Sequence, residues 1–304
     1  RSARDYLLNN FSLDSCRHKA SENQIRASAK AESSKNRKNT ETVISVREAW
    51  FRYEKDSKDI LCGMNFDVHA GELTCIVGGN GAGKTTALLT AAGVFSPYRG
   101  KVKYRGKPIS TFRKDKGSAG KIGVLVQNPL CCFVMDSVAE ELEATAKAYK
   151  LPRSVIEEVI DIMQLQSVLG SNPYDISGGE LQRAAIAKLL LPGPEVIFLD
   201  EATKGMDAFF KAEFGALLRR LAARGTAIVL VSHDIEFCAE FADRCAMFFN
   251  GTVIAEGTPH EVFLGNSFYT TSACRISRGI IPDALTSEQV IDYANRCERK
   301  KNDA

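Results

Sequence analysis

The stretch at positions 78–86, GGNGAGKTT, combines clustered glycines with a lysine and two threonines. It fits the pattern G-x-x-x-x-G-K-[ST], in which backbone N–H groups surround phosphate oxygens, the lysine neutralises the β- and γ-phosphates and the hydroxyl ligates Mg²⁺. A glycine-rich turn with one exposed lysine is the alternative. We predict that nucleotide phosphates bind here, and the residues expected to contact them are Gly78, Gly79, Asn80, Gly81, Ala82, Gly83, Lys84, Thr85 and Thr86.

The segments on either side of this stretch decide between the two interpretations. Residues 73–77, LTCIV, are typical of a buried strand, and residues 87–92, ALLTAA, favour a helix that begins inside the motif. A strand followed by a loop and a helix is the context in which a phosphate-binding loop forms, and the helix N-terminus adds its positive dipole end. The flanks therefore favour phosphate binding.

Two adjacent carboxylates follow a second apolar run. Residues 196–199, VIFL, predict a strand buried on both faces, and Asp200 and Glu201 come directly after it. Asp200 is expected in the Mg²⁺ shell, and Glu201 is expected to polarise the attacking water as a general base. A strand ending in acidic turn residues is the alternative, and a phosphate-binding loop in the same chain makes it the weaker one.

Two more polar residues stand at the ends of predicted buried strands. Gln127 follows residues 122–126, and His233 follows residues 227–231 and one serine. Because α/β proteins bind ligands at the carboxyl ends of parallel strands, Gln127 could reach Mg²⁺ or the attacking water, and His233 could bind the γ-phosphate or orient the water. Taken alone, the glutamine would be only a cap and the histidine structural.

A second anion-binding pattern lies far along the chain. Ser177, Gly178 and Gly179, followed by Glu180, precede the apolar helical residues 184–191. A capping hydroxyl and free N–H groups at a helix start form an anion site. A second phosphate site of this kind is unusual in a simple kinase.

Tyr53 lies at the end of a predicted strand, upstream of the phosphate-binding loop. There its ring could stack on an adenine. A strand aromatic packed in the core is an equally good interpretation of the sequence alone.

Composition and charge narrow the class of protein. The chain has 304 residues, 44% hydrophobic and 25% charged, which is enough for one large α/β domain with extensions or two small domains. The net charge of +3 gives no reason to expect a nucleic-acid partner. Nine cysteines without metal-ligand spacing indicate a reducing cytosol, and we expect Cys131 and Cys132 to be two packed thiols. No apolar run reaches the ~20 residues of a membrane span.

The remaining pattern divides the chain into three parts. Residues 1–41 predict a short helix at 4–11 and then a flexible linker, and the absence of an initial methionine indicates a piece of a longer polypeptide. Residues 42–265 form the predicted nucleotide-binding domain, and residues 266–304 an irregular segment at 268–281, a helix at 285–296 and frayed residues from 299 onward. Further strands are expected at 43–46, 49–53, 60–68, 100–104, 245–249 and 252–256, and further helices within 137–169 and at 260–264.

In their order, these motifs resemble those of the ATP-binding-cassette ATPases. They are Tyr53 (A-loop), 78–86 (Walker A), Gln127 (Q-loop), ISGGE at 176–180 (signature), FLDEAT at 198–203 (Walker B), KGMD at 204–207 (D-loop) and His233 (H-loop). The resemblance spans about residues 43–260. It implies an α/β fold, a P-loop NTPase cassette with a RecA-like core sheet, an antiparallel β subdomain and a helical signature subdomain, with ATP and Mg²⁺ as cofactors.

In such ATPases two cassettes face each other head to tail, and each ATP lies between the Walker A of one and the signature of the other. Residues 177–180 would therefore serve the ATP of a second cassette, in a homodimer or a fused sister domain. Lys204 and Met206 stand where the D-loop usually carries Ser or Asn and Leu, which changes dimer contacts. Glu201 and His233 are both present, so the resemblance implies an active ATPase.

Two further segments narrow the resemblance. Residues 127–129 and 136–142 resemble importer ATPases for cobalt, nickel and vitamins, and the tail at 268–286 resembles the second cassette of fused energy-coupling factor (ECF) ATPases. This resemblance implies a peripheral protein at the cytoplasmic face of the cell membrane that powers import of a vitamin or micronutrient. A membrane scaffold would bind near Gln127 and 137–169, and a separate component would select the substrate. The alternatives are a soluble cassette protein acting on ribosomes or DNA and a non-hydrolysing structural cassette.

Overall fold

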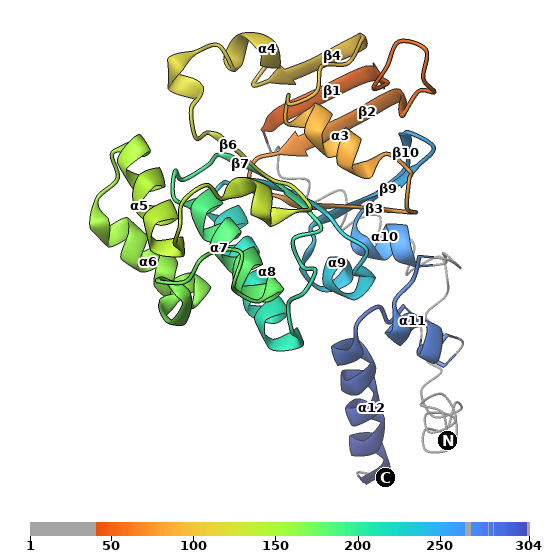
Figure 1. The fold of residues 1–304 in the computed structure, drawn as a ribbon. Coiled ribbons are helices and arrows are strands. Elements are labelled where there is room, and N and C mark those ends of the chain that lie inside the picture. Colours follow the sequence, from red (N-terminus) through yellow and green to blue (C-terminus); the bar gives the residue numbers. More distant parts are fainter. Residues whose placement is uncertain (1–40, 265–268, 279, 282, 303–304) are drawn as a thin grey trace.

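Six strands form the larger of two sheets in the computed structural model, which describes residues 41–264, 269–278, 280–281 and 283–302 (Figure 1). They are β3 (Leu73–Gly78), β6 (Ile122–Leu125), β7 (Val196–Asp200), β8 (Ala227–Val231), β9 (Arg244–Phe249) and β10 (Thr252–Gly257). Their order is β10-β9-β3-β8-β7-β6, and every pair except β10 with β9 is parallel. Strands β3, β7 and β8 are buried throughout, as apolar runs predict for strands covered on both faces.

Four predicted site segments follow the carboxyl ends of parallel strands and therefore lie at one edge of this sheet. The phosphate-binding loop follows β3, and Gln127 comes shortly after β6. Glu201 follows β7 directly, and His233 follows β8 after one serine. Because parallel strands point the same way, residues far apart in the sequence meet at this edge, which is where α/β folds bind ligands.

A smaller antiparallel sheet covers one face of the larger sheet (Figure 1). Its strands are β1 (Thr42–Phe51), β2 (Leu61–His69), β4 (Arg99–Tyr104) and β5 (Lys107–Pro108), in the order β2-β1-β4-β5, and the short helix α4 (Ile109–Phe112) follows. Helix α3 (Lys84–Ala91) contacts both sheets, and its Leu88 shares one buried cluster with Ile44 and Phe198. The two strand segments predicted at 43–46 and 49–53 form one strand with a register shift between Val46 and Ala49.

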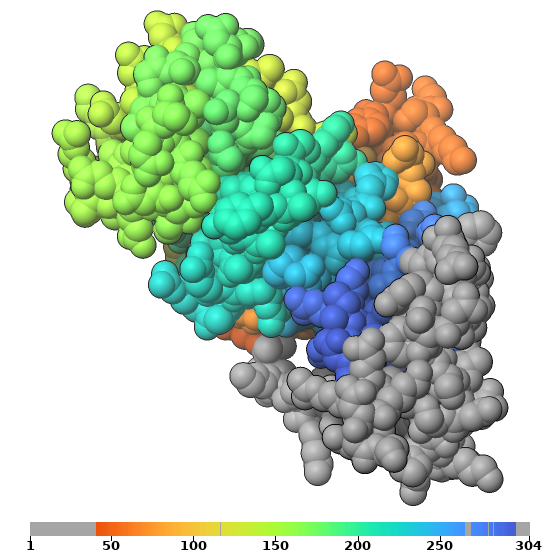
Figure 2. Space-filling model, turned by 90° about the horizontal axis from the view of Figure 1, so that it is seen from below, coloured from red at the N-terminus to blue at the C-terminus, as the bar shows by residue number. Residues whose placement is uncertain are grey.

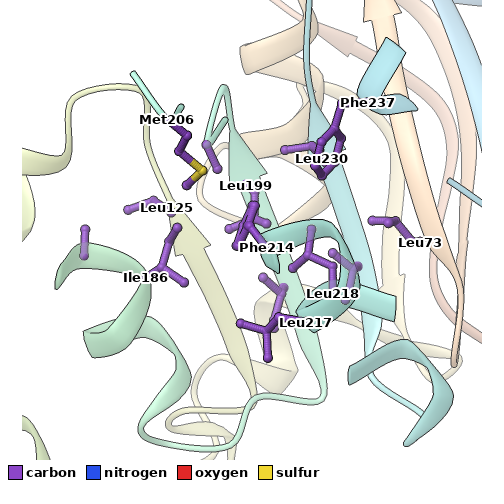
Figure 3. Close-up of a cluster of buried hydrophobic side chains, with 14 of the residues drawn as sticks. Leu73, Leu125, Ile186, Leu199, Met206, Phe214, Leu217, Leu218, Leu230 and Phe237 are labelled. Atoms are coloured by element: carbon purple, nitrogen blue, oxygen red, sulfur yellow. The ribbon is translucent and has the colours of Figure 1, made fainter. Parts of the chain in front are cut away.

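Helices cover the opposite face of the larger sheet. They are α7 (Gly178–Leu190), α8 (Ala208–Ala223), α9 (Ile235–Phe241) and α10 (Pro259–Phe263). Figure 3 shows how Leu199 and Leu230 of the sheet pack with Phe214 and Leu218 of α8, all buried. Helices α8 and α9 are absent from the predicted elements, although the apolar residues of α8 recur at helical spacing.

Helices α5 (Val138–Tyr149) and α6 (Arg153–Met163) form a lobe with α7 beside the sheet, which is the green part of the molecule in Figure 2. Val138, Leu142 and Met163 are buried in the same cluster as the apolar face of α7. The prediction of a mainly helical segment over 137–169 is therefore correct. Single 3₁₀ turns occupy Lys116–Ser118, Pro129–Cys132 and Gln166–Val168.

The C-terminal segment contains α11 (Ser272–Ser277) and α12 (Ser287–Asn302). The prediction of an irregular segment over 268–281 is wrong for α11, because the hydroxyl of Thr271 accepts a hydrogen bond from the amide of Cys274 and so caps that helix. Helix α12 begins near 285 as predicted, but it continues through residues 299–302, which were expected to fray. Cys274 and Leu285 belong to the main core cluster, so this segment packs on the cassette.

Some predictions fall on residues outside the described ranges, namely the helix at 4–11 and almost all of the linker at 1–41. Within the described ranges, no helix is both long and apolar enough to cross a membrane. The cysteines described there are free thiols. Cys132 is half-buried and Cys131 is exposed, so the prediction that both pack is wrong for Cys131.

Candidate nucleotide-binding site

The ammonium of Lys84 lies inside the phosphate-binding loop. Its Nζ donates hydrogen bonds to the carbonyls of Gly78 at 3.0 Å and Gly79 at 2.8 Å, and the residue is 6% exposed. Burial lowers the pKa of Lys84, and the charges of Glu201 and Asp200 oppose that shift. The loop thus encloses a single positive charge at the position predicted to neutralise phosphate.

Two glycines allow the backbone of this loop to close. Gly78 has a φ of 155°, and a Cβ there would overlap the carbonyl oxygen of Phe248 in β9. Gly83 has a φ of 98° and precedes α3 without a side-chain cap, so the first N–H groups of that helix keep their capacity to bind an acceptor. A side chain at position 78 would therefore force the loop away from the sheet.

Thr85, at the start of α3, and Asp200, the last residue of β7, come together. The Thr85 hydroxyl donates to Oδ2 of Asp200 at 2.8 Å, whereas Oδ1 of Asp200 is buried without a hydrogen-bond partner among the described residues. Burial raises the pKa of Asp200, the hydrogen bond from Thr85 opposes this, and the charge of Glu201 adds to it. A carboxylate oxygen without a partner beside a hydroxyl fits the small protein share of a Mg²⁺ shell, which phosphates and waters complete. In the described ranges, no cluster of three or more His, Cys, Asp or Glu would hold a metal alone.

The carboxylate of Glu201 is held from two sides. Nε2 of Gln127 donates to its Oε2 at 3.1 Å, and Nε2 of His233 lies 3.1 Å from its Oε1. The Glu201 amide donates to the carbonyl of Val231 at 2.9 Å, which ties the end of β7 to β8. Three of the four residues predicted as catalytic therefore meet at one carboxylate.

Tyr53 stands at the outer wall of the site. Its hydroxyl lies 3.0 Å from Oγ1 of Thr86, and its ring meets the rings of Phe51 and Phe95 edge-on at centroid distances of 5.2 and 5.7 Å. Because Tyr53 is 59% exposed, the interpretation of this residue as a core aromatic is wrong. Its ring is free to stack on a flat ligand.

A cavity of about 590 Å³ joins these groups. Its lining residues are Tyr53, Ile60, Asn80, Gly81, Gly83, Lys84, Thr85, Thr86, Gln127, Glu201, Lys204 and His233. Among the other predicted residues, Gly78, Gly79 and Ala82 belong to the loop without lining the cavity, and Asp200 is buried beside Thr85. The volume is within the range of small-molecule sites.

The predicted signature residues lie outside this cavity. Ser177 caps α7, with its hydroxyl accepting from the amide of Glu180 while the Glu180 carboxylate accepts from the amide of Ser177. The Ser177 hydroxyl also donates to Oε2 of Glu180 at 2.6 Å, and this hydrogen bond, together with the one from the Ser177 amide, lowers the pKa of Glu180. Ser177 and Gly178 are exposed, so the start of α7 is accessible from outside and does not line the cavity of its own chain.

Ile60 and Lys204 line the cavity but are not among the predicted site residues. Ile60 lies just before β2, and nothing in its own sequence context marks it as a ligand contact. The sequence marks Lys204 only as an unusual residue of the D-loop and does not predict that it lines the cavity. The hydroxyl of Tyr269 lies 3.5 Å from the point where a Cβ on Gly79 would stand, so the C-terminal segment also reaches the phosphate-binding loop.

Together, the two sheets, the loop after β3 and the carboxylates after β7 define a P-loop nucleotide hydrolase of the cassette type. The family described as ABC transporter matches residues 61–204. A putative ABC transporter ATP-binding protein of Bacillus cereus is 38% identical over 258 residues, which are 84% of this chain and 46% of that protein. The chain spans about half the length of such Bacillus relatives.

Two further similarities cover most of the compared protein. The energy-coupling factor transporter ATP-binding protein EcfA of Methanocaldococcus jannaschii is 33% identical over 226 residues, 73% of this chain and 81% of that protein. The solved structure of cbiO1 from Clostridium perfringens, described as part of the ABC transporter complex cbiONQ, is 30% identical with a TM-score of 0.66 and covers 74% of this chain and 92% of its own. The chain belongs to the ABC transporter ATPases of energy-coupling factor and cobalt type.

Proposed function

We propose that this chain is the ATP-hydrolysing cassette of an ECF-type importer for a vitamin or micronutrient. The observation that carries the proposal is the Glu201 carboxylate, which Gln127 and His233 hold at 3.1 Å each beside the phosphate-binding loop. The names of the EcfA relatives and of the cbiONQ complex support the transporter type.

Hydrolysis would use groups that already face one cavity. Glu201 would accept the proton of the attacking water as general base, with His233 and Gln127 fixing the direction of its carboxylate. Lys84 would neutralise negative charge on the β- and γ-phosphates, and the loop N–H groups would orient them. Thr85, Asp200 and Gln127 would hold Mg²⁺, which supplies charge neutralisation of the phosphates when bound.

A complete site would need a second cassette. Residues 177–180 would contact the ATP of that cassette, since they are placed outside the cavity of their own chain. The second cassette is either another copy or a fused sister domain, and a chain that spans 46% of its Bacillus relative agrees with the fused arrangement. We propose residues 1–41 as the linker or end of the preceding cassette, 42–265 as the cassette and 266–304 as its C-terminal extension.

The membrane scaffold would bind next to Gln127 at the cytoplasmic face of the membrane. The segment that follows Gln127 exposes Val134 at 85% and Met135 at 42%, an apolar tip beside the helical lobe. Apolar side chains presented in this way favour a protein partner over water. The scaffold and a separate substrate-binding component would then determine which compound is transported.

ATP hydrolysis by the purified chain, measured against protein concentration and beside Glu201→Gln, tests the enzymatic part. We expect activity that rises faster than linearly with concentration and disappears in the variant. Nucleotide binding without hydrolysis at any concentration would mean that this cassette requires its sister or membrane partner. Concentration-independent activity, or activity that survives in Glu201→Gln, would contradict the proposed site.

Membrane attachment is tested by fractionating native cells that carry Val134→Glu. We expect the unaltered protein in the membrane fraction and the variant largely in the soluble fraction, because a buried charge at the contact is costly. Ile254→Glu on β10 is the matched control, since Ile254 is exposed at 55% on a different part of the molecule. Equal distribution of the two variants would contradict the proposed contact.

A further inference from the structure

Lys204 occupies an anchored loop between the carboxylates after β7 and helix α8. Its backbone amide donates to the carbonyl of Glu201 at 3.0 Å, which closes a turn directly at the proposed general base. Ala202 and Met206 on either side are buried in the core, whereas the side chain of Lys204 is exposed. Figure 3 shows Met206 pointing into the core cluster, so a buried side chain anchors this loop two residues after Lys204.

Lys204 is one of two lysines that line the cavity. The other lining lysine is Lys84, at the phosphate-binding loop. In the described part of the chain, no carboxylate lies within 4 Å of the Lys204 ammonium. Glu201, the carboxylate in the lining, is already bound by Gln127 and His233. Lys204 therefore brings an unneutralised positive charge to the cavity.

We propose that Lys204 binds the terminal phosphate of ATP within the same chain, from the turn that follows Glu201. The inference rests on the proposed binding of ATP in this cavity. A flexible ammonium suits this task because it contacts phosphate as a point charge without a fixed geometry. Since ADP lacks the terminal phosphate, Lys204 makes the site prefer ATP over ADP.

Loss of the Lys204 charge should therefore change the preference for ATP over ADP rather than the affinity for both nucleotides. Removing one charge-assisted contact to the terminal phosphate should weaken binding of a triphosphate by about tenfold. Binding of ADP, held by Lys84 and the loop N–H groups, should change less than about twofold, since an exposed charge acts weakly on more distant groups in water. A lysine that serves only folding or solubility would leave the ratio of the two affinities unchanged.

Calorimetric titration with Mg²⁺ and either ADP or the non-hydrolysable analogue AMPPNP tests the inference. The chains compared are the unaltered protein, Lys204→Gln, Lys204→Arg and the control Lys147→Gln, which removes an exposed charge from α5 outside the cavity. We expect the AMPPNP-to-ADP preference to fall about tenfold in Lys204→Gln and to persist in Lys204→Arg and the control. Equal weakening of both nucleotides, or no change, would overturn the inference.

Protein concentration separates this contact from one made across two cassettes. The titrations are run at concentrations where analytical ultracentrifugation gives a monomer. If Lys204→Gln leaves the preference of the monomer unchanged and alters it only in the dimer, the placement within one chain is wrong. An unaltered protein that binds neither nucleotide would refute the proposed function itself. Nucleotide binding with an unaffected preference in Lys204→Gln would refute only the role of Lys204.

Discussion

Oε1 of Glu201 lies 3.1 Å from Nε2 of His233, and this contact joins the ends of β7 and β8. Glu201 has a φ of 52°, a left-handed conformation that costs an ordinary residue about 1–2 kcal/mol. The hydrogen bond from its amide to Val231 holds the backbone in this conformation. Strain of this kind persists where the surrounding structure determines it, and here it coincides with the proposed general base.

The contact predicts that Glu201 and His233 act as a unit. Glu201→Gln should lower kcat by about 10²–10⁴-fold, the usual size of general-base catalysis, and leave ATP binding nearly unchanged. If His233 acts by orienting that carboxylate, adding His233→Gln to Glu201→Gln should reduce kcat little further. Steady-state kinetics of the two single variants and the double variant, in the assembled two-cassette protein, give the answer. Multiplicative losses would show that the histidine has a separate task.

A second prediction concerns Asp200, whose pKa burial raises above its ordinary value. A carboxyl group whose pKa is raised in the folded chain costs stability as the pH rises from the unfolded-state pKa through the folded-state pKa, because ionisation is more favourable in the unfolded chain, and the loss is complete above the folded-state pKa. Asp200→Asn should therefore raise the free energy of unfolding at pH 7 by about 1 kcal/mol without nucleotide. The same variant should lose the effect of Mg²⁺ on ATP binding, since it removes the charge that would hold the metal.

Asp207→Asn is the matched control for that prediction. Asp207 accepts a hydrogen bond from the amide of Phe210 at 2.8 Å as the cap of α8, and asparagine caps helices about as well as aspartate. Thermal unfolding with and without Mg²⁺ and ATP measures both effects. A lower melting temperature of Asp200→Asn without nucleotide would contradict the argument from burial.

The residues of the candidate site could be predicted from the sequence largely because they follow strongly apolar strands. The strands that end at Gly78 and Asp200 are continuous apolar runs in the sequence, and because these strands are parallel, their carboxyl ends lie together. Helix α8 carries a comparable signal, because the buried residues Phe210, Phe214 and Leu218 recur at helical spacing. It is missing from the predicted elements because it directly follows the motif residues of the D-loop. The helical spacing alone is sufficient to predict it.

Other parts of the site depend on contacts that no local pattern contains. Ile60 joins the cavity because the turn before β2 packs beside Gly83, and the carbonyl of Ile60 stands 3.0 Å from where a Cβ on Gly83 would lie. Tyr269 reaches Gly79 from a segment nearly 200 positions later. Tertiary packing decides both of these contacts. The cap of Thr271 on α11 is local, but it depends on one hydroxyl in a stretch that otherwise lacks periodicity.

A third prediction concerns the buried pair of Glu141 and Lys188. Lys188 Nζ lies 2.5 Å from Oε2 of Glu141, and Oε1 of Glu141 accepts from the amides of Val134 and Met135. Burial alone would raise the pKa of Glu141, but these hydrogen bonds outweigh it and lower that pKa. A carboxylate of this kind stabilises the fold above its unfolded pKa, and the contribution is lost as the pH falls through the lower folded pKa.

Glu141→Gln should therefore lower the free energy of unfolding at pH 7 by about 2–4 kcal/mol, since Lys188 loses its carboxylate partner and keeps the carbonyl of Cys132 and some contact with water. The variant should also show a weaker fall in stability between about pH 5 and pH 3 than the unaltered protein. Glu157→Gln, from the exposed pair with Arg153, is the control and should change stability by less than about 0.5 kcal/mol. Parallel pH profiles for Glu141→Gln and the unaltered chain would contradict the assignment.

The last prediction treats the C-terminal segment as part of the cassette. Leu285 is buried in the main core cluster, and Ser272 at the start of α11 donates its amide and hydroxyl to Oε1 of Glu236 at 3.0 and 2.9 Å. Leu285→Ala should lower the free energy of unfolding by about 2–5 kcal/mol, as for other buried leucines. Ile291→Ala on α12 should have little effect, because Ile291 is 57% exposed.

Calorimetry distinguishes one cooperative unit from two. If residues 269–302 fold with the cassette, Leu285→Ala will shift a single transition, whereas an independent extension would unfold in a step of its own and leave the main transition in place. Because Tyr269 approaches Gly79 of the phosphate-binding loop, ATP should also slow hydrogen exchange of the α11 amides. If ATP does not change hydrogen exchange in α11 and the extension unfolds in a separate calorimetric transition, the extension does not fold as part of the cassette.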